Sequence, residues 1–330
     1  NICTSQALLA VMAGFFAIYH GPNGLIGIAN DIHKKTRILF NALKSGDHEI
    51  LNNNFFDTLS IRLKGDIQEI KTRLLDAKIN INWFDNNLVS ISIDEATTSD
   101  DIIDLVFALS GKSISNISED GEASLNKEIV RSSDFMKQER FNKYHSETEM
   151  MRYIKRLSDK DIALDRSMIP LGSCTMKLNS ASEMAPVSWP EFANMHPYCP
   201  TDQTKGYQVL IKDLREMLSS ITGYYDISLQ PNAGSQGEYA GLLAIDAYHK
   251  NNGDDNRSIC LIPRSAHGTN PASAMMVGMK VVPVECDSEG NIDLKDLKEK
   301  SSLHKSNLSA IMITYPSTHG VFESKCEEVC

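Results

Sequence analysis

A run of small residues from Gln230 to Gly237 lies between an apolar segment and the start of a predicted helix. Such a turn leaves backbone N–H groups unpaired at the positive end of the helix dipole, where a phosphate binds well. The glycines leave room for a ligand, and Ser235 and Gln236 add side-chain donors. We therefore predict a small-molecule phosphate site at Gly234, Ser235 and Gln236, with a purely structural turn as the alternative.

The two commonest phosphate motifs are absent from the sequence. It contains no GxxxxGK[ST], which excludes a P-loop, and the glycine spacing 234, 237, 241 differs from the dinucleotide pattern GxGxxG. The turn therefore indicates a phosphate ligand of another kind.

Two further polar groups follow apolar segments. His267 comes after a predicted strand at 258–263, where its ring could stack on an aromatic cofactor or bond a nearby carbonyl as an ordinary strand-end histidine. Thr318 follows another predicted strand, at 310–315. With His319 it could donate to a hydroxyl of the cofactor ring or cap a helix that begins near Val321. Together with the turn, these residues indicate a phosphorylated aromatic cofactor.

A third group of polar residues lies upstream, in SCTMKLN at 173–179. Its hydroxyl and amide groups suit a carboxylate ligand, so we predict substrate contacts from Ser173, Cys174, Thr175 and Asn179. A nucleophilic thiol would need an activating partner for Cys174 that the sequence does not show. A Schiff-base role for Lys177 is likewise less favoured than a charge at the rim of the site.

The elements that position these groups alternate between strand and helix from residue 225 onward. Apolar strands separated by helices predict a mostly parallel sheet with helices on both faces. Ligands of such sheets bind beyond the carboxyl ends of the strands, so the predicted groups converge on one edge. The predicted strands are 227–229, 258–263, 280–285 and 310–315, and the predicted helices are 237–250, 271–277 and 293–300.

The first part of the chain has a different pattern. Residues 4–19 are apolar on nearly every face and predict a buried helix, which Gly21-Pro22 should end. Strands and helices then alternate irregularly to residue 111, which predicts a small α+β unit. A polar linker at 112–147 follows. The predicted elements are a helix at 24–43, strands at 56–63 and 88–93, helices at 65–75, 98–111, 147–157 and 206–221, and a loop-rich stretch at 167–204.

Composition narrows the class of protein. The 330 residues carry a net charge of −10 with no long basic run, which argues against nucleic acid or an anionic membrane as a partner. We find no apolar run that should span a membrane. The seven cysteines are scattered without a CxxC pair, so we expect a reducing compartment and no metal site. The first and last residues do not look like natural termini, so we expect a fragment.

The longer motifs resemble one family, the P-protein of the glycine cleavage system, a pyridoxal-phosphate (PLP) dependent glycine dehydrogenase (decarboxylating). The resemblance covers essentially the whole chain and is weakest across the linker. It rests on NICTSQALLAVMA at 1–13, DRSMIPLGSCTMKLN at 165–179, QPNAGSQGEYAGLLAI at 230–245, SAHGTNPASA at 265–274 and TYPSTHGVFE at 314–323.

The resemblance implies a fold-type-I, aspartate-aminotransferase-like α/β architecture that occurs twice in the family's chain. Residues 1–135 would end the first half, including its small α+β domain, and residues 136–330 would begin the second, PLP-binding half. The turn at Gly234, Ser235 and Gln236 would hold the cofactor phosphate. His267 would stack on the pyridine ring, Thr318 would lie near its hydroxyl, and residues 173–179 would line the glycine pocket.

The implied reaction is decarboxylation of glycine, with transfer of the aminomethyl group to the lipoyl arm of H-protein. The family's Schiff-base lysine and ring-nitrogen aspartate lie downstream of residue 330, so we expect the chain alone to be inactive. Implied partners are glycine, lipoylated H-protein and a second chain, in a homodimer or a heterotetramer of halves. We favour the cytoplasm over the mitochondrial matrix. Another fold-type-I enzyme, such as a desulfurase or aminotransferase, or a non-catalytic assembly scaffold, remain the alternatives.

Overall fold

The computed structural model describes residues 7–44, 46–113, 125, 128–161 and 180–330. They form two compact units, one of residues 10–171 and the other of residues 1–9 together with 172–330. The first unit contains an antiparallel sheet, and the second contains a parallel one. The predicted division of the chain between residues 135 and 136 concerns the family's two halves and stays a prediction.

The first unit contains the predicted small α+β fold. Its four strands form an antiparallel sheet in the order β1-β2-β4-β3. The strands are β1 (Glu49–Ile50), β2 (Thr58–Arg62), β3 (Asn82–Trp83) and β4 (Leu88–Ser92). The helices are α1 (Ala7–Lys44), α2 (Ile67–Asp76), α3 (Ser99–Ser110), the 3-10 turn η1 (Glu139–Phe141) and α4 (Glu147–Ser158).

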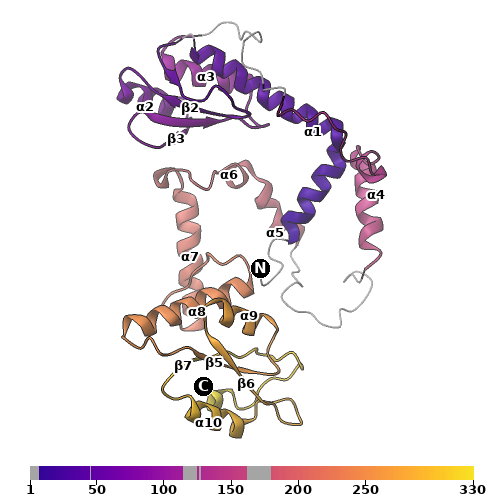
Figure 1. Ribbon diagram of the computed structural model, residues 1–330, viewed down its shortest axis with the longest axis vertical. Helices are drawn as coiled ribbons and strands as arrows, with labels where there is room; N and C mark the ends of the chain where they lie inside the picture. The colour runs from indigo at the N-terminus through magenta and orange to yellow at the C-terminus, as the bar shows by residue number, and fades with distance from the viewer. Residues whose placement is uncertain (1–6, 45, 114–124, 126–127, 162–179) are drawn as a thin grey trace. The chain divides into compact units, whose positions relative to one another are not determined.

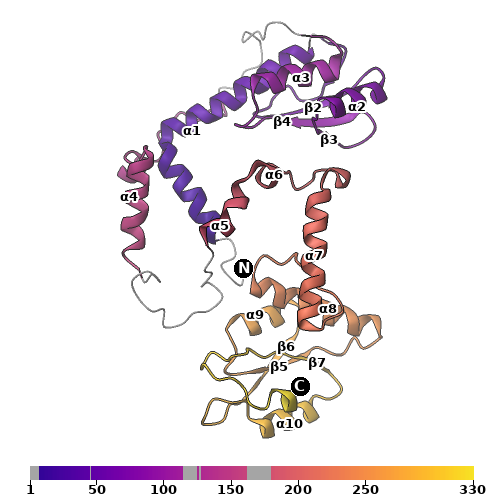
Figure 2. The same ribbon diagram turned by 180° about the vertical axis from the view of Figure 1, so that it is seen from behind.

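Alternation along β2 and β4 builds the core of this unit. Leu59 pairs with Ile91 and Ile61 with Val89, and all four side chains are buried on one face of the sheet. Successive strand residues point to opposite faces, so the intervening polar residues face outward. The C-terminal half of α1, with α2 and α3, covers the apolar face, as the back view of the ribbon also shows (Figure 2).

Helix α3 begins as the sequence predicts. Thr98 is its N-cap, and its hydroxyl accepts a hydrogen bond from the N–H of Asp101 at 3.1 Å. The Asp101 carboxylate accepts from the N–H of Thr98 at 2.7 Å, which completes a capping box. Gly111 ends the helix in the left-handed region, at φ 70°.

Helix α1 confirms one part of its prediction and contradicts another. It consists of two helices that meet at a kink at Gly21, as predicted, where the backbone is not helical (φ 61°) and glycine tolerates this angle (Figure 1). The first part was predicted to be buried, but Leu8 and Leu9 are 67% and 66% exposed. An apolar helix is stabilised when other parts of the protein bury it, but its sequence does not identify which parts those are. By length and composition alone α1 could also cross a membrane, so the expectation that no segment is long enough is wrong.

The second unit confirms a mixed α/β fold with a parallel sheet. Its three strands run in the order β6-β5-β7, and both pairings are parallel. The strands are β5 (Ile259–Pro263), β6 (Lys280–Val284) and β7 (Leu308–Ile311). The helices and 3-10 turns are α5 (Ala181–Met184), η2 (Ala185–Ser188), α6 (Pro190–Ala193), η3 (Thr201–Gln203), α7 (Lys205–Thr222), α8 (Gly234–Asn251), α9 (Thr269–Met276), α10 (Leu294–Leu303) and α11 (Cys326–Val329).

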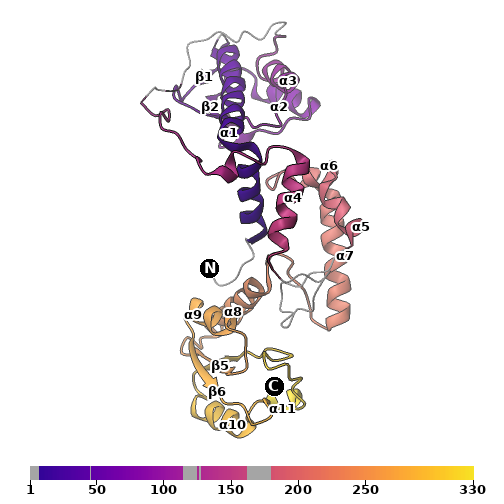
Figure 3. The ribbon, with the colours of Figure 1, turned by 90° about the vertical axis from the view of Figure 1, so that its right-hand side faces the viewer.

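The central strand β5 is buried on both faces. Ile259 and Leu261 belong to a core cluster with Leu297 of α10. Cys260 and Ile262 belong to a second cluster, on the side of α8 and α9. Figure 3 shows α8 and α9 on one side of the strands and α10 on the other. A strand covered on both faces needs apolar residues at every position, which explains why β5 contains no polar side chain.

The predicted strand at 227–229 does not form. No described strand pairs with this segment, and three residues are too few to form a strand without a neighbour. The preceding residue also ties the chain locally. The carboxylate of Asp226 accepts from the N–H of Ile227 at 2.7 Å and from Nε of Arg215 at 3.1 Å. The segment therefore enters α8 as an irregular connection.

Candidate functional site

The N-terminus of α8 carries the predicted phosphate turn. Gly234 is the first residue of this 18-residue helix, and the N-cap Ala233 has no side-chain acceptor to offer. The N–H groups of Gln236 and Gly237 both donate to the carbonyl of Ala233, at 3.1 and 3.0 Å. This leaves the N–H groups of Gly234 and Ser235 for an external acceptor, at the end of the helix where an anion is favoured.

Ser235 supplies the second feature of this turn. The residue is only 5% exposed, and its hydroxyl has no hydrogen-bond partner among the described residues. A buried hydroxyl without a partner costs about 1–3 kcal/mol, so native proteins rarely keep one without a reason. The side chain of Gln236 closes the turn instead, since its Oε1 accepts from the N–H of Asn232 at 2.9 Å.

His267 lies in the connection from β5 to α9. Its backbone N–H donates to the hydroxyl of Thr314 at 3.1 Å. Thr314 lies in the segment that follows β7. The ring nitrogen Nδ1 of His267 accepts a hydrogen bond from the backbone N–H of Thr269 at 3.2 Å and lies 3.0 Å from Oγ1 of the same residue. The half-buried ring is therefore attached on one edge to the first residue of α9, which restricts its rotation.

Thr318 is attached to the same edge of the sheet. Its N–H and its hydroxyl both donate to the carbonyl of Ser265, at 3.0 and 2.8 Å. No helix begins at Val321 in the described structure, so Thr318 is not a helix cap. Its hydroxyl proton is committed to a carbonyl, and only its lone pairs remain for a ligand.

A carboxylate that the sequence analysis did not single out joins these segments. Glu238 lies on α8, one turn after Gly234, and accepts hydrogen bonds from Oγ1 of Thr269 at 3.2 Å and Oγ of Ser273 at 3.3 Å. Residues four apart share a face of a helix, so both hydroxyls of α9 point toward α8. The four-residue spacing of Thr269 and Ser273 in the sequence indicates that their hydroxyls lie on one face of a helix. It does not identify Glu238 as the group that accepts from them.

The structure thus brings together three of the predicted segments. The turn at the start of α8 contacts α9 through Glu238, and Thr269 of α9 contacts the ring of His267. Thr318 contacts Ser265, two residues before that histidine. The predicted substrate residues lie outside the described residues: Ser173, Cys174, Thr175 and Asn179.

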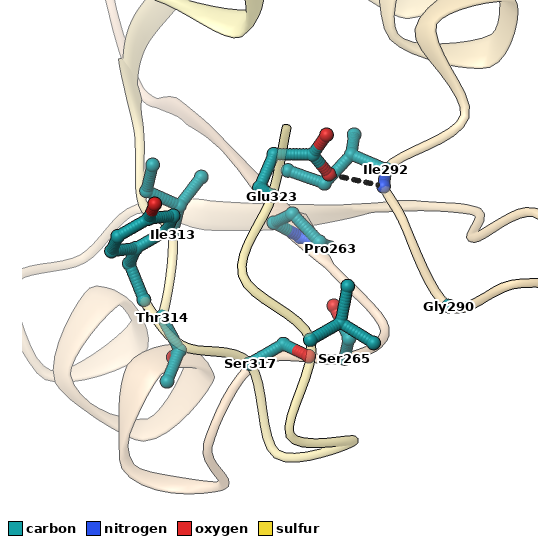
Figure 4. Close-up of a pocket in the computed structure, with 10 residues that line it drawn as sticks. Pro263, Ser265, Gly290, Ile292, Ile313, Thr314, Ser317 and Glu323 are labelled. Atoms are coloured by element: carbon teal, nitrogen blue, oxygen red, sulfur yellow. Dashed lines mark hydrogen bonds between the residues drawn. The ribbon is translucent and has the colours of Figure 1, made fainter. Parts of the chain in front are cut away.

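A small hollow lies at the same edge, beside these residues (Figure 4). Glu323 stands at its wall and accepts from the N–H of Ile292 at 2.7 Å through Oε2. Ser265 and Ser317 line it, but none of the predicted cofactor residues does. The hollow is therefore not the pocket of the predicted phosphate turn.

One cysteine lies in the central strand of this sheet. Cys260 is fully buried in β5, and burial raises the pKa of its thiol to about 11. A thiol in that state is neutral at physiological pH and is not a nucleophile. Within the ranges that the structure describes, no cluster of three or more His, Cys, Asp and Glu side chains could hold a metal ion.

Comparison with known proteins gives one consistent family. A model of the glycine cleavage system P-protein family matches residues 1–109. Glycine dehydrogenase (decarboxylating) of Nostoc punctiforme is 52% identical over 341 aligned residues, which cover 100% of this chain and 35% of the relative. The proteins of the same name from Shewanella pealeana and Akkermansia muciniphila are 52% and 51% identical, again over 100% of this chain and 35% of the relative.

The chain therefore spans about a third of the length of the curated relatives it matches. The matched third includes both units of the structure and every motif on which the resemblance rests. The resemblance to the P-protein of the glycine cleavage system is thus confirmed along the whole chain, which corresponds in sequence to about one third of such a protein.

Proposed function

We propose that this chain forms part of a glycine-decarboxylating P-protein. Glycine would release its carboxyl group as CO₂, and the remaining aminomethyl group would bond to one sulfur of the lipoyl disulfide of H-protein, while the other sulfur becomes a thiol. The observation that carries this proposal is the 52% identity, over the full chain, to proteins named glycine dehydrogenase (decarboxylating). The geometry of the sheet edge supports it independently.

The cofactor we propose is PLP, bound in a fold-type-I site. The parallel sheet with helices on both faces supports this fold, as does the convergence of polar groups at the carboxyl ends of its strands. When bound, PLP supplies an electron sink for the bond that breaks at the substrate carbon. The chain's own residues bind and orient that group.

The residues present fit the phosphate of such a cofactor. The unpartnered, 5% exposed hydroxyl of Ser235 and the open N–H groups at the start of α8 together offer donors to an anion. Gly234 and Gln236 shape the turn. His267 would face the pyridine ring, and Thr318 would accept from or lie beside the ring hydroxyl.

The remaining assignments belong to the same proposal. Ser173, Cys174, Thr175 and Asn179 would contact the glycine carboxylate. Lipoylated H-protein would dock at the mouth of the site, and the working assembly would be a homodimer or a heterotetramer of halves. We place the protein in the cytoplasm.

A chimera tests the activity directly. The 330 residues replace the matching third of the Nostoc punctiforme relative, and exchange of labelled bicarbonate into glycine is measured with PLP and lipoylated H-protein. We expect exchange that depends on both additions. The matched control carries His267→Asn, and we expect it to fold and to lose most of the exchange. A folded chimera with no exchange, or exchange unaffected by His267→Asn, would contradict the proposal.

A further inference from the structure

His267 supplies hydrogen-bond acceptors to the start of helix α9. The first N–H groups of a helix have no partner within the helix, and the N-cap Gly268 has no side chain that could accept from them. Nδ1 of His267 accepts from the N–H of Thr269 at 3.2 Å, and the carbonyl of His267 accepts from the N–H of Asn270 at 3.0 Å. The histidine thus satisfies the first two N–H groups of α9, one with its ring and one with its backbone.

An accepting Nδ1 determines where the ring carries its proton. A neutral imidazole has one N–H and one bare nitrogen, and the nitrogen that accepts a hydrogen bond is the bare one. The hydroxyl of Thr269 lies 3.0 Å from Nδ1 and 3.2 Å from Oε1 of Glu238. It can donate to either acceptor, so it requires no proton on Nδ1. A proton there would instead point at the N–H of Thr269, at the positive end of the helix dipole. The neutral ring therefore carries its proton at Nε2.

The contacts around this histidine hold its ring in place. The N–H of His267 donates to the hydroxyl of Thr314 at 3.1 Å, and that hydroxyl donates to Oδ1 of Asn270 at 3.3 Å. Thr269 and Asn270 are buried, at 9% and 3% exposure, so water does not easily replace these contacts. The ring itself is half-buried, and among the described residues no group accepts from Nε2. The N–H of the ring is therefore open to a ligand.

We propose that His267 presents a fixed ring N–H, at Nε2, to the ligand, and that Thr269 is the positioning residue that holds this form through its backbone N–H. The inference deepens the proposed function and rests on it in one respect, namely that the ring of His267 faces the cofactor site. The ligand atom beside Nε2 is then a hydrogen-bond acceptor, for which an anionic oxygen such as a carboxylate or phenolate is suited. In this form the ring offers no bare nitrogen to the substrate, so His267 does not act as a general base.

The first experiment measures the ring form of His267 directly. The full 330-residue chain is labelled with ¹⁵N-histidine and studied without cofactor at about pH 8.5, where an ordinary histidine ring is neutral. Long-range ¹H–¹⁵N correlations distinguish a protonated ring nitrogen from a bare one, and His267→Asn identifies the signals. We expect a protonated Nε2 and a bare Nδ1. A proton on Nδ1 would overturn the proposal.

Two variants of Thr269 test whether its N–H holds that form. Thr269→Pro removes the N–H, at a first helical position where proline is tolerated. Thr269→Val is the matched control, because it keeps the N–H and removes only the hydroxyl. Without the N–H the ring should exchange between its two neutral forms, so the two ring-nitrogen shifts should move toward each other. In Thr269→Val they should keep their parent values. Parent shifts in Thr269→Pro, or equal changes in both variants, would overturn the role of Thr269.

A comparison of two side chains at position 267 decides the question even if Thr269→Pro does not fold. His267→Asn keeps an acceptor near the position of Nδ1, whereas His267→Leu has none. We expect His267→Asn to melt about 2–4 °C above His267→Leu, because an accepting side chain at the start of a helix stabilises it. Equal melting temperatures would contradict the acceptor role of Nδ1.

The chimera tests the donor toward the ligand. His267→Gln places an amide N–H near the position of Nε2, which His267→Asn does not reach. We expect His267→Gln to exchange bicarbonate about 2- to 10-fold faster than His267→Asn. Equal rates in the two folded variants would show that the ligand does not use the Nε2 proton. The spectra and melting curves contain no cofactor, so a chimera without any exchange would refute the proposed function and leave the ring form intact. A proton on Nδ1 would refute this inference alone.

Discussion

Replacing Ser235 by alanine should separate folding from ligand binding at the start of α8. The hydroxyl is buried, and no described residue satisfies it, so the folded chain without ligand bears its desolvation cost. A bound phosphate would satisfy it. The substitution should therefore have opposite effects on the stability of the unliganded chain and on the affinity for a phosphorylated ligand.

Both magnitudes follow from hydrogen-bond energetics. Removal of an unsatisfied buried hydroxyl should stabilise the unliganded chain by about 1 kcal/mol, which raises the melting temperature of a unit of this size by about 2–4 °C. A hydrogen bond to a charged group contributes about 1.5–3 kcal/mol, so its loss should weaken phosphate binding by about 10- to 100-fold.

The assay uses two ligands and a control variant. Pyridoxine 5′-phosphate has no aldehyde and cannot react with surface lysines, and pyridoxine lacks the phosphate. Calorimetric titration gives Kd for each, and a thermal scan gives the melting temperature. Ser309→Ala is the matched control, because Oγ of Ser309, within β7, is also buried and unpartnered in the described structure. It should raise stability similarly and leave both affinities unchanged.

Two outcomes would refute this reasoning. If Ser235→Ala lowers the melting temperature, the hydroxyl has a partner in the unliganded protein. If Kd for pyridoxine 5′-phosphate rises equally in both variants or in neither, the turn at the start of α8 does not bind the phosphate.

Two further predictions concern the scaffold. Gly21→Ala should lower the free energy of unfolding by about 2–4 kcal/mol in urea. The glycine has φ +61°, and a Cβ there would meet His145 Cε1 at 2.6 Å. Gly14→Ala, with nothing within 4 Å, should instead stabilise by about 0.5–1 kcal/mol; equal effects would contradict the argument. Burial raises the pKa of Cys260 from 9.0 to about 11, so the folded state keeps a proton that the unfolded state loses. Stability should therefore fall from pH 9 to pH 11, and Cys260→Ala should remove this slope in pH-dependent unfolding; an identical slope in the variant would contradict this assignment.

The parts of the fold that the sequence predicts correctly are those with a local cause. The apolar run of β5 predicts a strand buried on both faces, and its alternate residues do pack in two separate clusters. Asp293 caps α10 through hydrogen bonds to the N–H groups of Lys295 and Asp296. Side-chain caps act within three residues, so their geometry can be inferred from sequence alone.

The errors concern properties that depend on distant neighbours. The apolar residues 227–229 have no described strand to pair with, so they remain irregular. The first part of α1 is apolar, yet Leu8 and Leu9 are exposed in the described structure. Strand formation and burial both require a partner, and a local pattern does not identify one.

The candidate site shows the same division. Its turn and its histidine follow from position after a strand or before a helix. The contact of Glu238 with Thr269 joins residues 31 positions apart, and that of Thr318 with Ser265 joins residues 53 apart. Neither contact has a local signature, because each depends on how the elements pack. The sequence therefore locates the polar groups of the candidate site. The fold determines which of them are already hydrogen-bonded to one another.

The hydrogen bonds already formed within the protein indicate which groups at this edge would contribute to ligand binding. The hydroxyl of Thr318 and the N–H of His267 already have partners within the protein, and Glu238 already receives two hydroxyls. Among described residues, Ser235 alone keeps a buried, unpartnered side-chain polar atom at this edge. The proposed cofactor would therefore gain most from its phosphate and would find the groups around its ring already fixed. If the edge binds the proposed cofactor, fixed groups around the ring beside an unsatisfied phosphate turn would favour binding by the phosphate with the ring oriented by the protein, because ordering the surrounding side chains costs little further entropy.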